Sequence, residues 1–345
     1  MTTSSANIPI IDLSGPQKEV AKQLVDAATE HGFIYIKNLG DDIPAASVDE
    51  AFALSRKLLG APVEEKQACS IQTNNRGWTS MHAETLDPQN QKVGDFKEAF
   101  NFGEFIDNKA QQPIPPTIAD DEARFSAFAN ICRALCLKIL TLLGQGLEVN
   151  DFFSSAHFKS PSGSGTILRF LRYPPPSSTS HTADDIRAGA HSDYGSITLL
   201  FRLKGQAGLE ILKKDGTWAP VPVVPPGTEN DPSPPILINI GDLLSYWTNG
   251  LFRSTVHRVV FPTNGEHTSV EGETSSEARY SIAFFCHPMD DALLEPVPSE
   301  RVRNFVPGGV VAGNPYAERK VLTAGEHLLM RLKESYGTLY DEKEE

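Results

Sequence analysis

Residues 166–285 constrain the fold most, because short β-rich runs alternate there with turns that contain glycine or proline. The run over residues 195–201 alternates and is rich in β-forming residues, which predicts a strand. Residues 235–244 form an apolar run that ends in a Gly-Asp turn, which is typical of a buried strand. Many short strands separated by such turns predict a β-barrel or a β-sandwich.

Helices are predicted around this β-rich segment. Apolar spacing predicts helices over residues 17–30, 46–59, 118–143 and 316–336, with strands within residues 1–13 and over residues 33–37. Gly144 is expected to end the long third helix. Two polar segments, residues 220–235 and 263–277, are expected to be mobile surface loops because they can bury little apolar area.

Composition narrows the class of protein. The chain of 345 residues has 40% hydrophobic and 22% charged residues, which is ordinary for one large folded unit. A net charge of -13 argues against a nucleic-acid partner, because phosphate binding needs a basic surface. No apolar run is long enough to lead us to expect a membrane span. The sequence leaves the oligomeric state open.

The cellular location is predicted from the first residues and the cysteines. Residues 1–7 have neither the basic start nor the apolar stretch of a secretory signal. The four cysteines show no framework spacing, so we expect free thiols in a reducing compartment. A cytoplasmic location follows as an expectation.

The motif His191-Ser192-Asp193 and the distant His257 predict a metal site. His191 and Asp193 point to the same face of a strand because they are two residues apart. Two imidazoles and one carboxylate are the ligand set of a non-haem Fe(II) centre that keeps coordination positions open. A short H-x-D recurs by chance, so the prediction depends on the third ligand and on the β-rich surroundings.

A second polar pair lies at the start of the last β-rich run. Arg279 and Ser281 are also two residues apart and share one strand face. A guanidinium beside a hydroxyl favours carboxylate binding, because arginine can contact both carboxylate oxygens at once. His287 and Asp290 could form an alternative ligand set, but an ordinary turn is the prediction there. Asp242 is interpreted as a structural turn residue.

The order H-x-D, then H, then R-x-S resembles the iron- and 2-oxoglutarate-dependent dioxygenases of the isopenicillin N synthase-like superfamily. Its N-terminal motifs are matched by residues 8–13, 32–36, 77–78 and 95–100. Closer similarity, to the fungal thymine dioxygenases, is carried by residues 167–174, 187–201, 254–260 and 279–286.

This resemblance implies a mainly β fold with flanking helices, in which a double-stranded β-helix (jelly-roll) core follows a helical N-terminal region. The divisions expected are residues 1–118 for the N-terminal dioxygenase region and 119–160 for a long supporting helix and connection. Residues 161–290 would form the jelly-roll catalytic core, and residues 291–345 a C-terminal helical segment. These parts are expected to act as one catalytic unit.

The resemblance also implies the cofactors and the reaction. Fe(II) would be held by His191, Asp193 and His257, while Arg279 and Ser281 would bind 2-oxoglutarate. Tyr173 resembles the family tyrosine that reaches the same carboxylate, although it could be only a strand-end aromatic. Dioxygen would be the third cosubstrate. The expected reaction hydroxylates or desaturates a small organic molecule and releases succinate and carbon dioxide.

Three further residues are candidates for substrate binding. Arg169 shares a strand face with Tyr173, so it would bind either a substrate oxygen or an internal carboxylate. Phe285 shares the face of Arg279 and would be either a stacking platform or a core residue. Tyr194 resembles a pocket residue of the same family. A pyrimidine-like heterocycle or a secondary metabolite is the expected substrate class.

Other functions fit parts of the pattern. An iron oxidase of the same superfamily could use Arg279 and Ser281 to hold the carboxylate of its own substrate, without 2-oxoglutarate. A binding protein could retain the fold without catalysis, but it would have no reason to keep three metal ligands. A zinc hydrolase would need a general base, and none is evident in the sequence.

Overall fold

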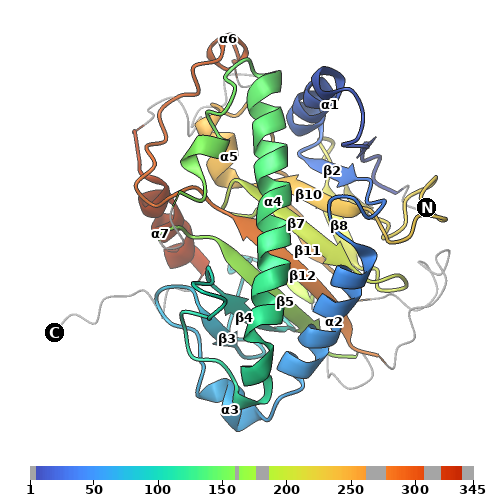
Figure 1. Ribbon diagram of the computed structural model, residues 1–345, viewed down its shortest axis with the longest axis vertical. Helices are drawn as coiled ribbons and strands as arrows, with labels where there is room; N and C mark the ends of the chain where they lie inside the picture. Colours follow the sequence, from blue (N-terminus) through green and yellow to red (C-terminus); the bar gives the residue numbers. More distant parts are fainter. Residues whose placement is uncertain (1–4, 160–162, 176–185, 262–276, 307–319, 336–345) are drawn as a thin grey trace.

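Two β-sheets form the centre of the protein, and helices cover one of them (Figure 1). The computed structural model describes residues 5–159, 163–175, 186–261, 277–306 and 320–335. The large sheet contains, in spatial order, β1 (Ile10–Ile11), β2 (Phe33–Ile36), β10 (Ile236–Ile240), β7 (Ile197–Arg202), β12 (Arg279–Cys286), β5 (Ile167–Tyr173), β4 (Glu98–Phe102) and β3 (Gly77–Thr79). The small sheet contains β6 (Ala188–His191), β11 (His257–Val259), β8 (Leu209–Leu212) and β9 (Trp218–Pro220).

The interior between the sheets is a hydrophobic cluster to which both contribute. Leu171 and Ala283 come from the large sheet, and Ile211 and Val259 from the small one. Strand β12 alternates as predicted. Ala283 and Phe285 face this interior, whereas Ile282, Phe284 and Cys286 belong to the core on the other face. The predicted mainly β fold is therefore confirmed.

The second core lies between the large sheet and the helices. Helix α4 (Glu122–Gly146) crosses the outer face of the sheet, and on one side of it α1 (Gln17–Glu30) lies beside its upper part and α2 (Ala45–Leu59) beside its lower part (Figure 1). The remaining helices are α3 (Val63–Gln67), α5 (Asp242–Trp247), α6 (Glu300–Arg303) and α7 (Ala324–Ser335), with short 3-10 turns at Pro116–Asp121 and Ser154–Ala156. The helices expected over residues 17–30 and 46–59 are confirmed, the second beginning one residue earlier.

Gly144 was expected to end the long helix, but α4 continues to Gly146. A Cβ atom at Gly144 would lie 2.0 Å from the carbonyl oxygen of Asn150. Glycine is needed there because the chain that leaves the helix turns back and packs directly against it.

The C-terminal helix begins later than expected, at Ala324. Residues 316–319 and 336 of the predicted helix lie outside the described residues. A capping box sets the start, because the Thr323 backbone N–H donates to Glu326 (2.8 Å) and the Glu326 N–H donates to the Thr323 hydroxyl (3.1 Å).

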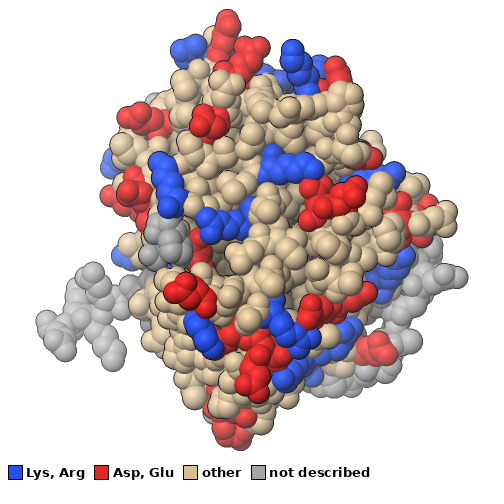
Figure 2. Space-filling view, viewed as in Figure 1, with Lys and Arg blue, Asp and Glu red and all other residues tan. Residues whose placement is uncertain are grey.

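One stretch of the described chain, Pro116–Gly146, is long and apolar enough to cross a membrane by length and composition alone. This differs from the expectation that no such run exists. Half of its most apolar window, 50%, is buried inside the protein, as in the core helix of a folded domain. Charged side chains of both signs are interspersed over the face that α4 crosses (Figure 2).

The proline-dense segment over residues 220–235 is better packed than the sequence suggested. Val221 and Val223 are only 2% and 4% exposed. Tyr35 and Arg202 both donate hydrogen bonds to the carbonyl of Pro222, which ties this segment to the large sheet. The second expected loop, residues 263–277, lies outside the described residues except for its last position.

Candidate metal and cosubstrate site

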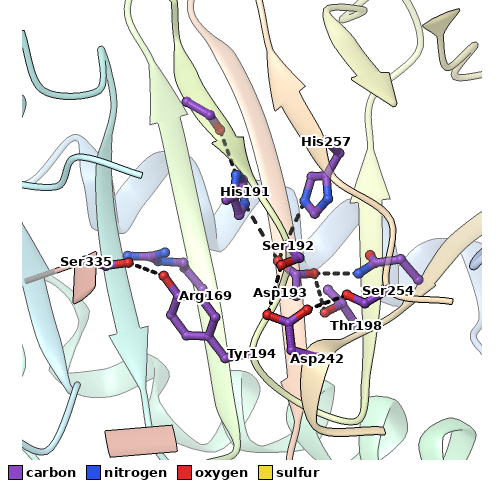
Figure 3. Close-up of polar contacts among 12 residues, drawn as sticks. Arg169, His191, Ser192, Asp193, Tyr194, Thr198, Asp242, Ser254, His257 and Ser335 are labelled. Atoms are coloured by element: carbon purple, nitrogen blue, oxygen red, sulfur yellow. Dashed lines mark hydrogen bonds and ion pairs between the residues drawn. The ribbon is translucent and has the colours of Figure 1, made fainter. Parts of the chain in front are cut away.

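His191 and His257 lie directly opposite each other on the neighbouring strands β6 and β11. Asp193 follows β6 by two residues, and its Oδ1 atom lies 3.7 Å from Nε2 of His191 and 3.6 Å from Nε2 of His257. One ligand atom from each residue lies within 4.8 Å of the others (Figure 3). The fold therefore brings together the three residues that the sequence singled out, although 66 positions of chain separate His191 from His257.

Hydrogen bonds orient both imidazoles. Nδ1 of His191 donates to the carbonyl of Gly189 (2.7 Å), and Nδ1 of His257 donates to the carbonyl of Thr255 (3.2 Å). The lone pair of each Nε2 atom is thereby left for a metal ion. Burial and the neighbouring His257 lower the pKa of His191 to about 3, so its ring is neutral at ordinary pH.

The carboxylate of Asp193 is held by two residues that sequence reasoning missed. Its Oδ2 atom accepts hydrogen bonds from the Thr198 hydroxyl (2.6 Å) and from Nδ2 of Asn239 (2.7 Å). Burial alone would raise the pKa of Asp193, but the two imidazoles and these hydrogen bonds hold it below its ordinary value. Asn239 gave a signal that could have been used, since it is a polar residue inside the apolar strand β10.

Asp242 connects the segments that carry the three candidate metal ligands. Its carboxylate accepts hydrogen bonds from Ser192 (2.9 Å) and from Ser254 (2.6 Å), and it pairs with Arg331 of α7 (2.9 Å) (Figure 3). These contacts agree with the structural role predicted for Asp242. They also fix the chain at Ser192 and at Ser254, close to the strands that carry His191 and His257.

The residues predicted to bind 2-oxoglutarate lie deeper between the sheets. Arg279 is paired with Tyr173 across β12 and β5, and its guanidinium carbon lies 4.8 Å from the tyrosine ring centroid. Nε of Arg279 donates to the carbonyl of Ala207 (2.9 Å), whereas its Nη1 atom is buried without a hydrogen-bond partner. Ser281 is buried two residues further along the strand. A buried guanidinium with a free donor fits the carboxylate of a cosubstrate.

A pocket opens to solvent at the other end of the same strands, with about 500 Å³ of empty space. His191 and Asp193 line it together with all three predicted substrate residues, Arg169, Tyr194 and Phe285. Phe285 is six residues from Arg279 on β12, a separation of roughly 20 Å along a strand. Two of the three candidate metal ligands, His191 and Asp193, thus line an open pocket, and the buried Arg279 lies at the far end of β12.

Arg169 makes the internal ion pair that the sequence offered as one alternative. Its Nη2 atom lies 3.2 Å from Glu84, and Glu84 also pairs with Lys97 at 2.8 Å. Lys97 pairs in turn with Asp95 at 2.5 Å. Glu84 lines the same pocket as Arg169, so the ion pair and a substrate contact are compatible. Sequence reasoning missed Glu84 and Lys97, because their pairing depends on distant segments.

Helix α7 forms part of the pocket wall, which the sequence did not reveal. Leu328 and Leu332 line the pocket. The Tyr194 hydroxyl is hydrogen-bonded to Ser335, and the Arg331 guanidinium lies 5.1 Å from the Tyr194 ring centroid. The C-terminal segment therefore forms a wall of the pocket beside Tyr194, the residue that follows the candidate metal ligand Asp193.

His287 also lines the pocket, but it does not belong to the metal-binding group. Burial lowers its pKa to about 3, which keeps the ring neutral. Among the described residues, Asp290 likewise lies outside the metal-binding group. The alternative ligand set of His287 and Asp290 is therefore not formed.

Comparisons with known proteins agree with this geometry. The family model described as non-haem dioxygenase in morphine synthesis N-terminal matches residues 8–119, and that of the 2OG-Fe(II) oxygenase superfamily matches residues 164–288. The chain belongs to the 2OG-Fe(II) oxygenase superfamily. It is thus an enzyme, a dioxygenase that uses iron and 2-oxoglutarate, and its core is a jelly roll like that of its structural neighbours.

Relatives at the sequence and structural levels cover nearly the whole chain. UPF0676 protein C1494.01 of Schizosaccharomyces pombe is 35% identical, with 96% of this chain and 94% of the relative aligned. Proline hydroxylase buaE of Petromyces alliaceus is 29% identical, covering 93% and 95%. The structure of the full-length thymine 7-hydroxylase of Neurospora crassa in complex with alpha-KG has a TM-score of 0.74 and 26% identity, covering 96% and 99%. The predicted family, fold class and cofactors are confirmed, and 2-oxoglutarate is favoured over a reaction without it.

Proposed function

We propose that His191, Asp193 and His257 hold the Fe(II) of this dioxygenase, next to a pocket for a small organic substrate. The observation that carries the proposal is the convergence of three ligand atoms within 4.8 Å. The other polar atoms of Asp193 and of both imidazoles are occupied by neighbouring residues, so each side chain is preorganised to present one atom to the metal.

Arg279, Ser281 and Tyr173 are proposed to bind 2-oxoglutarate. Nη1 of Arg279 would donate to the carboxylate remote from the iron, with the Ser281 hydroxyl on the same strand face. When bound, iron and 2-oxoglutarate supply dioxygen activation and two electrons, with release of succinate and carbon dioxide. The protein orients the cosubstrate and limits water near the reacting atoms.

The substrate is proposed to lie between Arg169, Tyr194 and Phe285. Arg169 is paired with Asn101 across β5 and β4, and both line the pocket. The Oδ1 atom of Asn101 is buried without a partner. A guanidinium donor beside an amide acceptor suits a ring that carries adjacent carbonyl and N–H groups, and Phe285 suits stacking.

A pyrimidine-like heterocycle is thus the substrate class that we favour, with a cyclic secondary metabolite as the second candidate. Support comes from the Neurospora crassa thymine 7-hydroxylase, whose structure in complex with alpha-KG and thymine matches this chain with a TM-score of 0.74 at 25% identity. Leu328 and Leu332 of α7 would exclude water on the open side of the pocket.

A succinate-release screen with Fe(II) and ascorbate tests this function against thymine, uracil derivatives and a panel of cyclic metabolites. Asp193→Ala should abolish turnover and leave the folded far-UV circular dichroism spectrum intact. Asp120→Ala removes an exposed carboxylate and serves as the matched control. Retained activity in Asp193→Ala would show that the metal is held elsewhere, and inactivity towards thymine would remove only the narrow substrate assignment.

The wider setting of the enzyme is also proposed. We infer a cytoplasmic protein without a nucleic-acid partner, from the four cysteines that stay free and from the net charge of -13. We also propose that the chain is divided by role into the four expected segments, residues 1–118, 119–160, 161–290 and 291–345. Fractionation of cells that produce the tagged chain would check the location.

A further inference from the structure

Arg202 lies in the same row of the large sheet as the predicted cosubstrate residues. It ends β7 and is paired directly with Ser281 of β12, which is two residues from Arg279. Side chains that are paired across neighbouring strands point to the same face. Arg202 and Arg279 therefore enter the same interior, where they are only 6% and 2% exposed.

The contacts of Arg202 satisfy its hydrogen bonds but leave its charge unbalanced. Nη1 donates to the carbonyl of Val221 and Nη2 to that of Pro222, both at 2.9 Å. The guanidinium carbon also lies 5.8 Å from the Tyr35 ring centroid. Arg279 is likewise surrounded by a carbonyl and an aromatic ring. Across the described ranges, neither arginine forms an ion pair with a carboxylate.

Two buried lysines of this chain, by contrast, have acidic partners. Lys97 pairs with Glu84 and Asp95, and Lys66 pairs with Glu98 at 2.9 Å. Two guanidinium groups without such a partner are costly, because burial removes water from both charges and they repel each other. Burial, assisted by the charge of Arg279, lowers the pKa of Arg202. The space around Arg202 and Arg279 therefore favours the binding of an anion from outside the protein.

We propose that Arg202 is a specificity-determining residue of the cosubstrate site, whose charge selects a 2-oxo acid that carries a second carboxylate. The inference rests on the proposed roles of Arg279 and Ser281. Nη1 of Arg279 has no hydrogen-bond partner, whereas each terminal nitrogen of Arg202 already donates one hydrogen bond to a backbone carbonyl. The charge of Arg202 attracts the second carboxylate of the cosubstrate electrostatically, and this attraction is weakly screened in a buried interior.

Two ligands separate this electrostatic role from a structural one. 2-Oxoglutarate has the second carboxylate, and 2-oxopentanoate has the same chain length without it. Both are titrated calorimetrically into the anaerobic Fe(II)-loaded protein, with weak binding measured by displacement. In Arg202→Gln, the affinity for 2-oxoglutarate should fall about ten-fold, while that for 2-oxopentanoate stays within about two-fold. Arg202→Lys should recover most of the loss.

Arg172→Gln is the matched control, since Arg172 belongs to the neighbouring strand β5 and pairs with Glu98 on the opposite face. It should leave both affinities unchanged. If Arg202→Gln lowered the affinity for both ligands equally, or lowered neither, the inference would be overturned and the proposed function would stand. A wild-type protein that binds no 2-oxoglutarate would instead remove the proposed function and this inference together.

Discussion

Asn239 of β10 donates a 2.7 Å hydrogen bond to Oδ2 of Asp193, the carboxylate oxygen that does not face the imidazoles. Thr198 of β7 lies opposite Asn239 and donates to the same oxygen. Two adjacent strands of the large sheet thus fix a carboxylate whose partners lie on the small sheet. The proposed metal site therefore lies where the two sheets meet.

Replacing Asn239 should therefore weaken metal binding more than it affects the fold. Asn239→Leu leaves Oδ2 of Asp193 with one donor, so the affinity for Fe(II) should fall about 10- to 100-fold. Anaerobic Fe(II) titration measures this. Asn38→Ala removes another buried amide, which pairs with Ser233, and should leave metal affinity unchanged. Equal Fe(II) affinity in Asn239→Leu and wild type would contradict the role assigned to this hydrogen bond.

The Glu84 carboxylate should be important for stability. Glu84→Gln leaves Arg169 and Lys97 with a weaker partner in a buried site, so the free energy of unfolding should fall by about 3 kcal/mol. Urea denaturation provides the measurement. The exposed pair of Glu50 and Arg124 offers a control, since Glu50→Gln should change stability by less than about 0.5 kcal/mol. Similar effects at both positions would show that burial does not strengthen the Glu84 network.

Arg331 should hold helix α7 over the pocket. Arg331→Ala removes the ion pair with Asp242 and the contact with the Tyr194 ring. Because the pair is partly exposed, amide hydrogen exchange in α7 should accelerate by only about five-fold. Lys333→Ala, on the same helix, should leave the exchange rate at the wild-type value. Unchanged exchange in Arg331→Ala would mean that Arg331 does not hold the helix and that its other contacts are sufficient.

Acidification should destabilise the fold by protonating the buried His157. Nδ1 of His157 donates to the carbonyl of Phe153 and Nε2 accepts from the Ser196 hydroxyl, so the folded state needs the neutral ring. Burial lowers the pKa of His157 to about 4. The ordinary pKa of histidine is about 6.5. The stabilisation that depends on the neutral His157 ring is therefore fully present above pH 6.5, and it is lost as the pH falls towards 4.

From about pH 7.5 to about pH 5, His157 should contribute a loss of about 2 kcal/mol in the free energy of unfolding. Urea denaturation at both pH values should show a flatter dependence in His157→Gln than in wild type. His82→Gln, at an exposed position, should keep the wild-type dependence. Parallel pH profiles for His157→Gln and wild type would rule out this contribution.

The amino-acid sequence alone predicted helices α1 and α2, strand β12 and the candidate residues for the chemistry. Period-two alternation placed Arg279, Ser281 and Phe285 on one face of β12, and the H-x-D spacing placed His191 beside Asp193. Both signals are local, because side-chain direction along a strand depends only on neighbouring residues. The capping box at Thr323 is local too, and it explains where α7 begins.

Only the tertiary structure decided which distant groups meet these residues. Asn239 with Asp193, Glu84 with Arg169, and Arg202 beside Ser281 each join segments more than 40 residues apart. Such contacts follow from sheet order and packing, which depend on the whole chain, and short-range spacing carries no record of them.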